Sequence, residues 1–308
     1  MGSQKSQMKV DQVGIGKILK DFTLTVPSHH RDYSWTDLEV RTLLQDLAKA
    51  ISDNEPGYFL GTIVTIHGPS GRLEVIDGQQ RLATITILLC QIRHYLRGKD
   101  TIIAEDIKSF LFHTDRNQRA IVPRLRLNHA DNDFFRAMLS EEESERPTEP
   151  ALKSHKLITA AFKETSKYIE TIVSSYDVKV HGDILNKWIN FVEFSADVIL
   201  LQVPSGGNAY KMFETLNDRG LKTTQADLVK NYLFSQAGDR LPEAEHKWSL
   251  MRGALESLQE EEKEDITVTF FRHALIAIQG FLRQGEVYEA VQRNGKGAQA
   301  AVAFLRSV

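Results

Sequence analysis

The sequence has little cysteine and no long apolar run, and each shortage excludes a class of protein. Its 308 residues contain one cysteine, Cys90, which leaves no disulfide framework and no cysteine zinc site. A lone cysteine is typical of a reducing compartment, and we expect a cytoplasmic protein. No apolar run approaches the ~18 residues of a membrane-spanning helix and no signal-peptide core is present, so we expect no membrane partner.

Excess positive charge is also lacking. The formal net charge is −3 at neutral pH, which gives no global attraction to nucleic acid or to an anionic membrane. Contact with DNA therefore requires a local basic patch and should depend strongly on salt. The candidate residues for such a patch are Arg93, Arg97, Lys99, Arg116, Arg119, Arg124 and Arg126.

Three catalytic signatures are missing as well. There is no Walker A sequence, so any nucleoside triphosphate (NTP) chemistry is not of the P-loop kind. There is no HNH histidine constellation or other nuclease signature, so we expect that this chain alone does not cleave DNA. The pair His29–His30 has no further ligand at diagnostic spacing, and we predict no protein metal site.

Hydrophobic spacing and turn signals predict an α+β protein in two parts. Residues 1–140 mix strands and helices, residues 141–150 form a charged, proline-bearing loop, and residues 151–308 are mainly helical. We predict strands at 23–27 and 197–204, a hairpin from 58–66 and 72–76, and helices at 36–51, 79–96, 151–175 and 182–194. The pattern of residues 208–234 predicts two helices that are joined by a polar turn. The segment 297–308 resembles an interrupted helix, so we expect a longer parent protein.

The stretch "VIDGQQRLATITILL" (75–89) places polar side chains between a strand and a buried helix. If Asp77 caps that helix, its free first-turn N–H groups and its dipole favour an anion, and Arg81 adds a forked donor for phosphate. Gln79 and Gln80 are suited to orienting a sugar, a base or an attacking water. The same residues also fit a structural role, because Asp77 and Gln80 have the spacing of a capping box, and spacing alone favours that role.

Three motifs together resemble the N-terminal domain of GmrSD-type modification-dependent restriction proteins. They are "VPSHHRDYSW" (26–35), the DGQQR stretch above, and "FETLNDRGLKTTQADLVKNYLF" (213–234). The resemblance implies a ParB/sulfiredoxin-like core, which is a small mixed sheet with a hairpin embedded in a predominantly helical protein. It also implies a module that senses modified DNA and hydrolyses GTP or ATP with Mg²⁺. Its partner would be an HNH-type nuclease domain or subunit, and a homo-oligomer is compatible with it.

The resemblance implies site residues too. The DGQQR motif serves nucleotide binding and hydrolysis, which makes the candidate catalytic residues Asp77, Gln79, Gln80 and Arg81. The candidate nucleotide-binding residues are Gly78, Arg31, His30, Tyr33, Asn217, Arg219, Gly220, Asp227 and Lys230. His30 replaces the usual glutamine, although an imidazole also donates and accepts hydrogen bonds. We expect the three motifs to line one cleft.

Two other functional classes stay open beside the NTP-hydrolysing module. One is a ParB-like module that binds nucleotide or DNA without turnover, and the other is a DNase in its own right. Clear binding with slow or absent hydrolysis would identify the first class. Metal-dependent nicking by the pure protein would identify the second.

Overall fold

The computed structural model describes residues 8–28, 30–68, 71–116, 119–140, 146–147, 149–203, 225–258, 266–283 and 286–294, together with 299 and 303. The chain forms two compact units. The first unit takes in residues 1–27, 32–150 and 154–215, and the second takes in 28–31, 151–153 and 216–308. Each unit has its own hydrophobic core.

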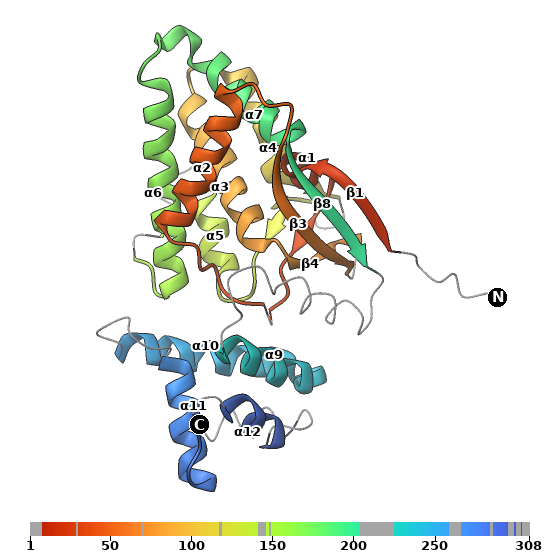
Figure 1. Ribbon diagram of the computed structural model, residues 1–308, viewed down its shortest axis with the longest axis vertical. Helices are drawn as coiled ribbons and strands as arrows, with labels where there is room; N and C mark the ends of the chain where they lie inside the picture. The colour runs from red at the N-terminus through yellow and green to blue at the C-terminus, as the bar shows by residue number, and fades with distance from the viewer. Residues whose placement is uncertain are drawn as a thin grey trace, which may run out of the picture. The chain divides into compact units, whose positions relative to one another are not determined.

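The first unit is built on a six-stranded mixed sheet (Figure 1). The strand order is β1 (Lys9–Gly14), β8 (Ala196–Val203), β3 (Tyr58–His67), β4 (Leu73–Asp77), β2 (Leu24–Thr25) and β7 (Leu125–Arg126). Strand β8 pairs antiparallel with β1 and parallel with β3, β3 and β4 form an antiparallel hairpin, and β2 pairs parallel with β4 and β7. The predicted hairpin and the strands near 23–27 and 197–204 are confirmed.

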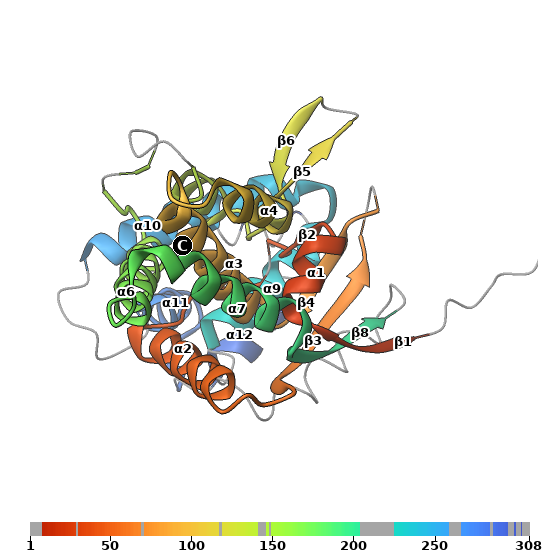
Figure 2. The ribbon, with the colours of Figure 1, turned by 90° about the horizontal axis from the view of Figure 1, so that it is seen from above.

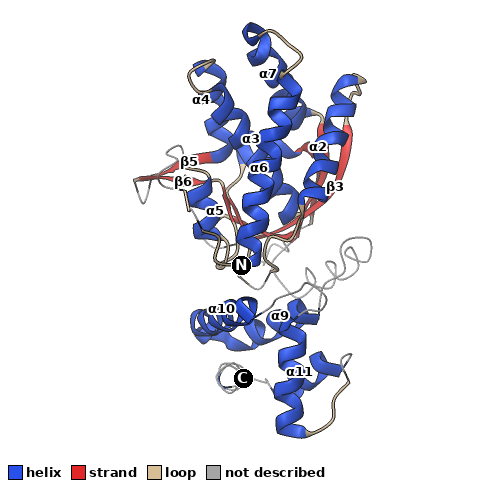
Figure 3. Cartoon of the chain, turned by 90° about the vertical axis from the view of Figure 1, so that its left-hand side faces the viewer, coloured by secondary structure: helices blue, strands red, loops and turns tan. Residues whose placement is uncertain are grey.

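The helices of the first unit gather on one side of this sheet (Figure 3). They are α1 (Ile15–Asp21), α2 (Asp37–Ser52), α3 (Gln79–Leu96), α4 (Thr101–Leu111), α5 (Asn132–Met138), α6 (Lys153–Val173) and α7 (His181–Phe194). A short 3₁₀ turn (Val178–Val180) precedes α7. A second, two-stranded sheet joins β5 (Phe112–Asp115) to β6 (Ala120–Pro123), and the sequence analysis did not predict it.

Helix α3 occupies the centre of the first core. Its apolar stripe Leu82, Ile85, Leu89, Ile92 and Leu96 is fully buried, as the helical spacing predicts. Helix α2 starts at a capping box, because the Thr36 hydroxyl accepts from the Leu38 N–H while Glu39 accepts from the Thr36 N–H. The mixed sheet, the hairpin and the predominance of helix are confirmed, and the ParB/sulfiredoxin-like core stays a prediction.

The second unit is helical where it is described. Its elements are α9 (Gln225–Ala237), a 3₁₀ turn (Gly238–Arg240), α10 (Leu241–Leu258), α11 (Ile266–Gln279) and α12 (Val287–Asn294). Trp248 stacks on Phe271 with ring centroids 5.7 Å apart, and both side chains are buried. Among the described residues of the whole chain, no helix has the length and apolar character that crossing a membrane requires.

Candidate functional site at the start of helix α3

Strand β4 passes into helix α3 through Asp77 and Gly78. Gly78 has a φ of +93°, and a Cβ at this position would lie 2.8 Å from Ile63 Cγ1, so both backbone conformation and space require glycine. Gly78 is the N-cap residue, and it has no side chain with which to cap the first turn of α3. Asp77 therefore does not occupy the N-cap position, which was one condition for the anion site considered from the sequence. Asp77 Oδ1 instead accepts from the Gly78 N–H at 2.7 Å, one residue before the helix begins.

Gln80 connects the DGQQR motif to the motif at 26–35. Its Oε1 accepts from the Ser34 N–H at 2.9 Å, and its Nε2 donates to the Asp32 carbonyl at 3.1 Å. The side chain is buried, so both contacts replace hydrogen bonds that water would otherwise make. Two motifs separated by more than forty residues therefore meet at the start of α3.

Tyr33 strengthens this junction one turn further along α3. Its hydroxyl lies 2.9 Å from Thr84 Oγ1, and its N–H donates to Asp131 Oδ2 at 2.7 Å. Burial, the largest cause, raises the pKa of the Tyr33 hydroxyl far above its ordinary value, so the phenol stays neutral. Tyr33 is therefore a packed structural tyrosine in this arrangement.

A buried carboxylate, Asp131, anchors the same junction, and the sequence analysis missed it. Asp131 Oδ1 accepts from Ser154 Oγ at 2.5 Å and lies 3.8 Å from His155 Nε2. Asn128 extends the network, because its Nδ2 donates to Asp32 Oδ1 at 2.7 Å and its Oδ1 accepts from the Asp131 N–H. These residues carry no recognisable motif, and only their contacts reveal the network.

Arg81 points to the backbone of the neighbouring strand. Its two terminal nitrogens donate to the carbonyls of Leu60 and Thr62, the latter at 2.7 Å, where β3 is irregular. Between them lies Gly61, with a φ of +101°, where a Cβ would collide with the guanidinium. Desolvation lowers the pKa of Arg81, and Asp77, 4.0 Å away, opposes that shift. The Arg81 guanidinium, which the sequence suggested as a donor to phosphate, instead donates to carbonyls of the irregular strand β3.

The remaining candidates divide into described and undescribed residues. His30 belongs to the second unit, where its carbonyl accepts from Lys230 Nζ at 2.9 Å and both residues are buried. This contact links the first motif to the end of the third motif. Gln79 is buried in the first unit, and Arg31 belongs to the second. Outside the described residues lie Asn217, Arg219, Gly220 and the side chain of Asp227.

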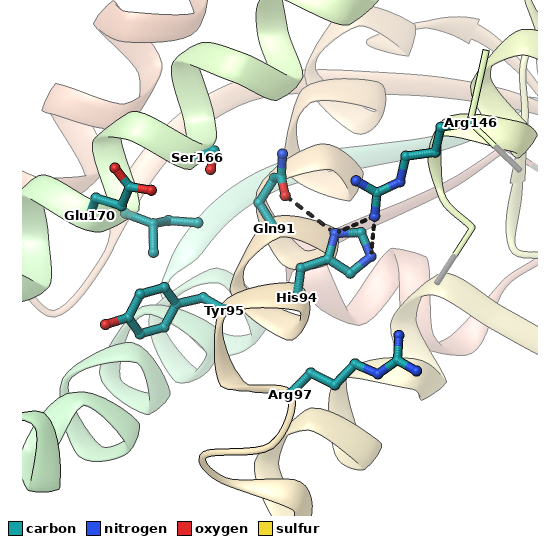
Figure 4. A pocket seen from close by; sticks show the side chains of 8 residues that line it. Gln91, His94, Tyr95, Arg97, Arg146, Ser166 and Glu170 are labelled. Carbon is teal, nitrogen blue, oxygen red and sulfur yellow. Dashed lines mark hydrogen bonds between the residues drawn. The ribbon is translucent and has the colours of Figure 1, made fainter. Parts of the chain in front are cut away.

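A cleft of about 550 Å³ opens at the other end of α3. Figure 4 shows its lining, in which Arg146 comes from a loop and lies against His94. Arg146 Nη2 is 3.1 Å from the His94 ring nitrogens and also donates to the Ser140 carbonyl at 3.1 Å. The complete lining is Gln91, His94, Tyr95, Arg97, Arg146, Ser166, Ile169 and Glu170. Two arginines face one carboxylate there, so the cleft is a polar, mostly cationic cavity.

Metal-ligating side chains do not gather anywhere in the described part of the chain. No group of three or more His, Cys, Asp or Glu side chains there is placed to hold an ion. Within the DGQQR motif, Asp77 is the single carboxylate, and its side chain is about a quarter exposed. Asp77 is therefore the one residue of the motif that combines negative charge with access to solvent.

Comparison with known protein families finds one match. The model of a family described as GmrSD restriction endonuclease, N-terminal domain, matches residues 15–234. The matched range includes both motifs that meet at the start of α3. Comparison with curated proteins finds no match.

Proposed function

We propose a function from one premise: the chain belongs to the family of GmrSD restriction endonuclease N-terminal domains. Membership implies a role in a modification-dependent restriction system, with DNA as the substrate of that system. We infer that this chain is its regulatory module. It binds and hydrolyses an NTP, either GTP or ATP with Mg²⁺, in response to modified DNA. Cleavage then belongs to an HNH-type nuclease domain or subunit.

The contact between the two motifs carries this proposal. Gln80 accepts from the Ser34 N–H and donates to the Asp32 carbonyl, so two hydrogen bonds hold the 32–34 segment against the first turn of α3. A site for a transferred phosphoryl group needs such fixed geometry, because phosphoryl transfer relies on positioning and charge stabilisation. In this proposal Gln80 and Arg81 are positioning residues that hold the turn.

Asp77 takes the chemical role. Mg²⁺ usually binds through one or two carboxylates together with the phosphates of its nucleotide, and it keeps several waters. Asp77 is a single, partly exposed carboxylate beside Gly78, and one such carboxylate is what Mg²⁺ bound to a nucleotide needs from the protein. We therefore propose that Asp77 would hold a Mg²⁺ ion that accompanies the nucleotide. The phosphates would lie against the Asp77–Gly78 turn.

The test is a hydrolysis assay with each of the four NTPs and Mg²⁺, with and without modified DNA. Asp77→Asn is the informative variant, because an amide oxygen still accepts from the Gly78 N–H while the negative charge is lost. We expect at least a tenfold fall in kcat/KM with unchanged thermal stability, because a charged contact contributes about 1.5–3 kcal/mol. The matched control is Asp133→Asn on α5, an exposed carboxylate.

Three other results would contradict the proposal. An unchanged Asp77→Asn enzyme together with an inactive Arg97→Gln/Arg146→Gln enzyme would place the nucleotide in the cleft at the far end of α3. Nucleotide or DNA binding without turnover would identify a ParB-like binding module. DNA nicking by the pure chain that a point mutation within it abolishes would identify a DNase.

A further inference from the structure

Basic side chains gather at the end of the sheet that is formed by β7. The fifteen residues 112–126 contain four arginines and one histidine but only one acidic residue, Asp115. Where they are described, these residues include the hairpin strands β5 and β6 and the edge strand β7. Figure 2 shows that this hairpin extends away from the helices and from the main sheet. A chain of net charge −3 therefore carries a concentrated positive segment on an element that extends outward from the first unit.

The sheet register brings an arginine that directly precedes another strand, β4, to the same place. Leu73, Leu24 and Leu125 are paired across β4, β2 and β7 and are buried in the core beneath the helices. Side chains alternate between the faces of a sheet, so the residues next to these leucines project from the opposite face. Arg126, which follows Leu125 in β7, therefore projects from the face that the helices do not cover, and Arg72, which directly precedes β4, lies near it.

Two nitrogens in this cluster are buried but unused. Arg72 Nη1 and His113 Nδ1 have no hydrogen-bond partner among the described residues. By contrast, Arg124 donates from Nε to the Ser109 carbonyl at 3.2 Å. Unsatisfied buried polar groups are uncommon, and an anion with several acceptor oxygens would satisfy the Arg72 guanidinium, which can only donate.

The cluster also repels itself. Burial lowers the pKa of Arg72, and Arg126 lowers it further. Burial likewise lowers the pKa of His113, with Arg124, Arg72 and Arg126 adding to the effect. Opposing negative charge comes from Asp115, which faces Arg72 and His113, and from Asp21, which faces Arg124. Like charges held together destabilise a protein, and a bound polyanion removes that repulsion.

We infer that this basic hairpin surface binds the phosphate backbone of duplex DNA. It consists of Arg72, His113, Arg116, Arg119, Arg124 and Arg126. The inference rests on the proposed function, because the restriction system supplies DNA as the polyanion, but it does not require nucleotide hydrolysis. Arginine forks match phosphate geometry, and a two-stranded ribbon fits the major groove of B-DNA.

The experiment measures binding of a short, unmodified, fluorescent duplex over a series of salt concentrations, without nucleotide. Arg72→Gln/Arg126→Gln removes charge at the base of the hairpin. Arg116→Gln/Arg119→Asn removes charge at its turn, and asparagine tolerates the φ of +51° at position 119. The matched control, Lys163→Gln/Lys167→Gln, removes two exposed charges from α6. Thermal unfolding of each variant checks its fold, and the turn pair remains informative if the base pair unfolds.

We expect each hairpin pair to weaken binding about tenfold and to flatten the slope of log K against log salt by about 0.9 per lost contact. The α6 pair should bind like the wild type. Equal affinities and slopes in all proteins would overturn the inference, as would an equal loss in the α6 pair. Wild-type protein that binds no duplex, or that prefers anionic lipid vesicles, would overturn it too. NTP hydrolysis is measured separately, so its absence would contradict the proposed function alone.

Discussion

Arginine is used in opposite ways at two places on the same sheet. At the start of α3, Arg81 gives its nitrogens to two carbonyls of β3 and lies 4.0 Å from the carboxylate of Asp77. On the basic hairpin surface, Arg72 lies near Arg126 and leaves a buried nitrogen without a described acceptor. The first arginine is satisfied by the fold, and the second is not.

This difference separates structure from recognition. A buried arginine whose fork is filled by backbone carbonyls stabilises the segment that it contacts, and breaking that contact leaves buried groups unpaired. Arginines held together at a surface weaken the fold slightly, and they are favourable only when an anion is present. The presence of an arginine in a family motif therefore does not show that it contacts a ligand. The groups that accept its hydrogen bonds in the folded protein show whether it has a structural or a binding role.

The largest expected effect comes from Arg81→Met. The substitution keeps an apolar stem but leaves the Leu60 and Thr62 carbonyls without their donors, so we expect a loss of about 3 kcal/mol in the free energy of unfolding. Urea unfolding measures it. Arg126→Gln serves as the comparison and should stay within about 0.5 kcal/mol of the wild type. Similar losses in both variants would show that the two arginines do not differ in role.

A smaller effect is expected from truncating one of two glutamines on the same helix. Gln80→Ala removes two buried hydrogen bonds to the 32–34 segment and should cost about 2 kcal/mol. Gln91→Ala, at the cleft, removes the bond from Nε2 to the Phe162 carbonyl and should cost about 1 kcal/mol. Thermal unfolding of both variants measures the two losses. A larger loss in Gln91→Ala than in Gln80→Ala would show that the start of α3 is not held more strongly than its end.

The smallest expected effect depends on pH. The pKa of His113 is lowered in the folded state, so below its unfolded value of about 6.5 the unfolded chain binds more protons. The His113 contribution to stability is thus present at neutral pH and is lost as the pH falls. His113→Gln should lose less stability between about pH 7.5 and pH 5.5, by at most about 0.5 kcal/mol, because solvent screens this site. An equal or larger loss in the variant would contradict the lowered pKa of His113, whose causes are burial and then the neighbouring arginines.

Local sequence patterns determined most of the elements around the candidate site. The cap at Thr36, the hairpin from β3 and β4 and the apolar stripe of α3 all follow from spacing and turn residues within one segment. Spacing alone could not decide whether Asp77 caps α3, because a glycine in the left-handed region takes the N-cap position and a capping-box spacing cannot show that. The hairpin β5–β6 was missed because its two strands are only four residues long.

The sequence by itself determined the family, the helix and hairpin segments and the polar junction between β4 and α3, because these depend on neighbours along the chain. Only the tertiary structure decided what the polar side chains contact. Strand β8 joins β1 and β3 from opposite ends of the first unit, Gln80 reaches the 32–34 segment, and Arg81 turns to the bulge of β3. Hydrogen-bond partners this distant in sequence are chosen by packing, since buried donors and acceptors take whichever groups the folded backbone brings within reach.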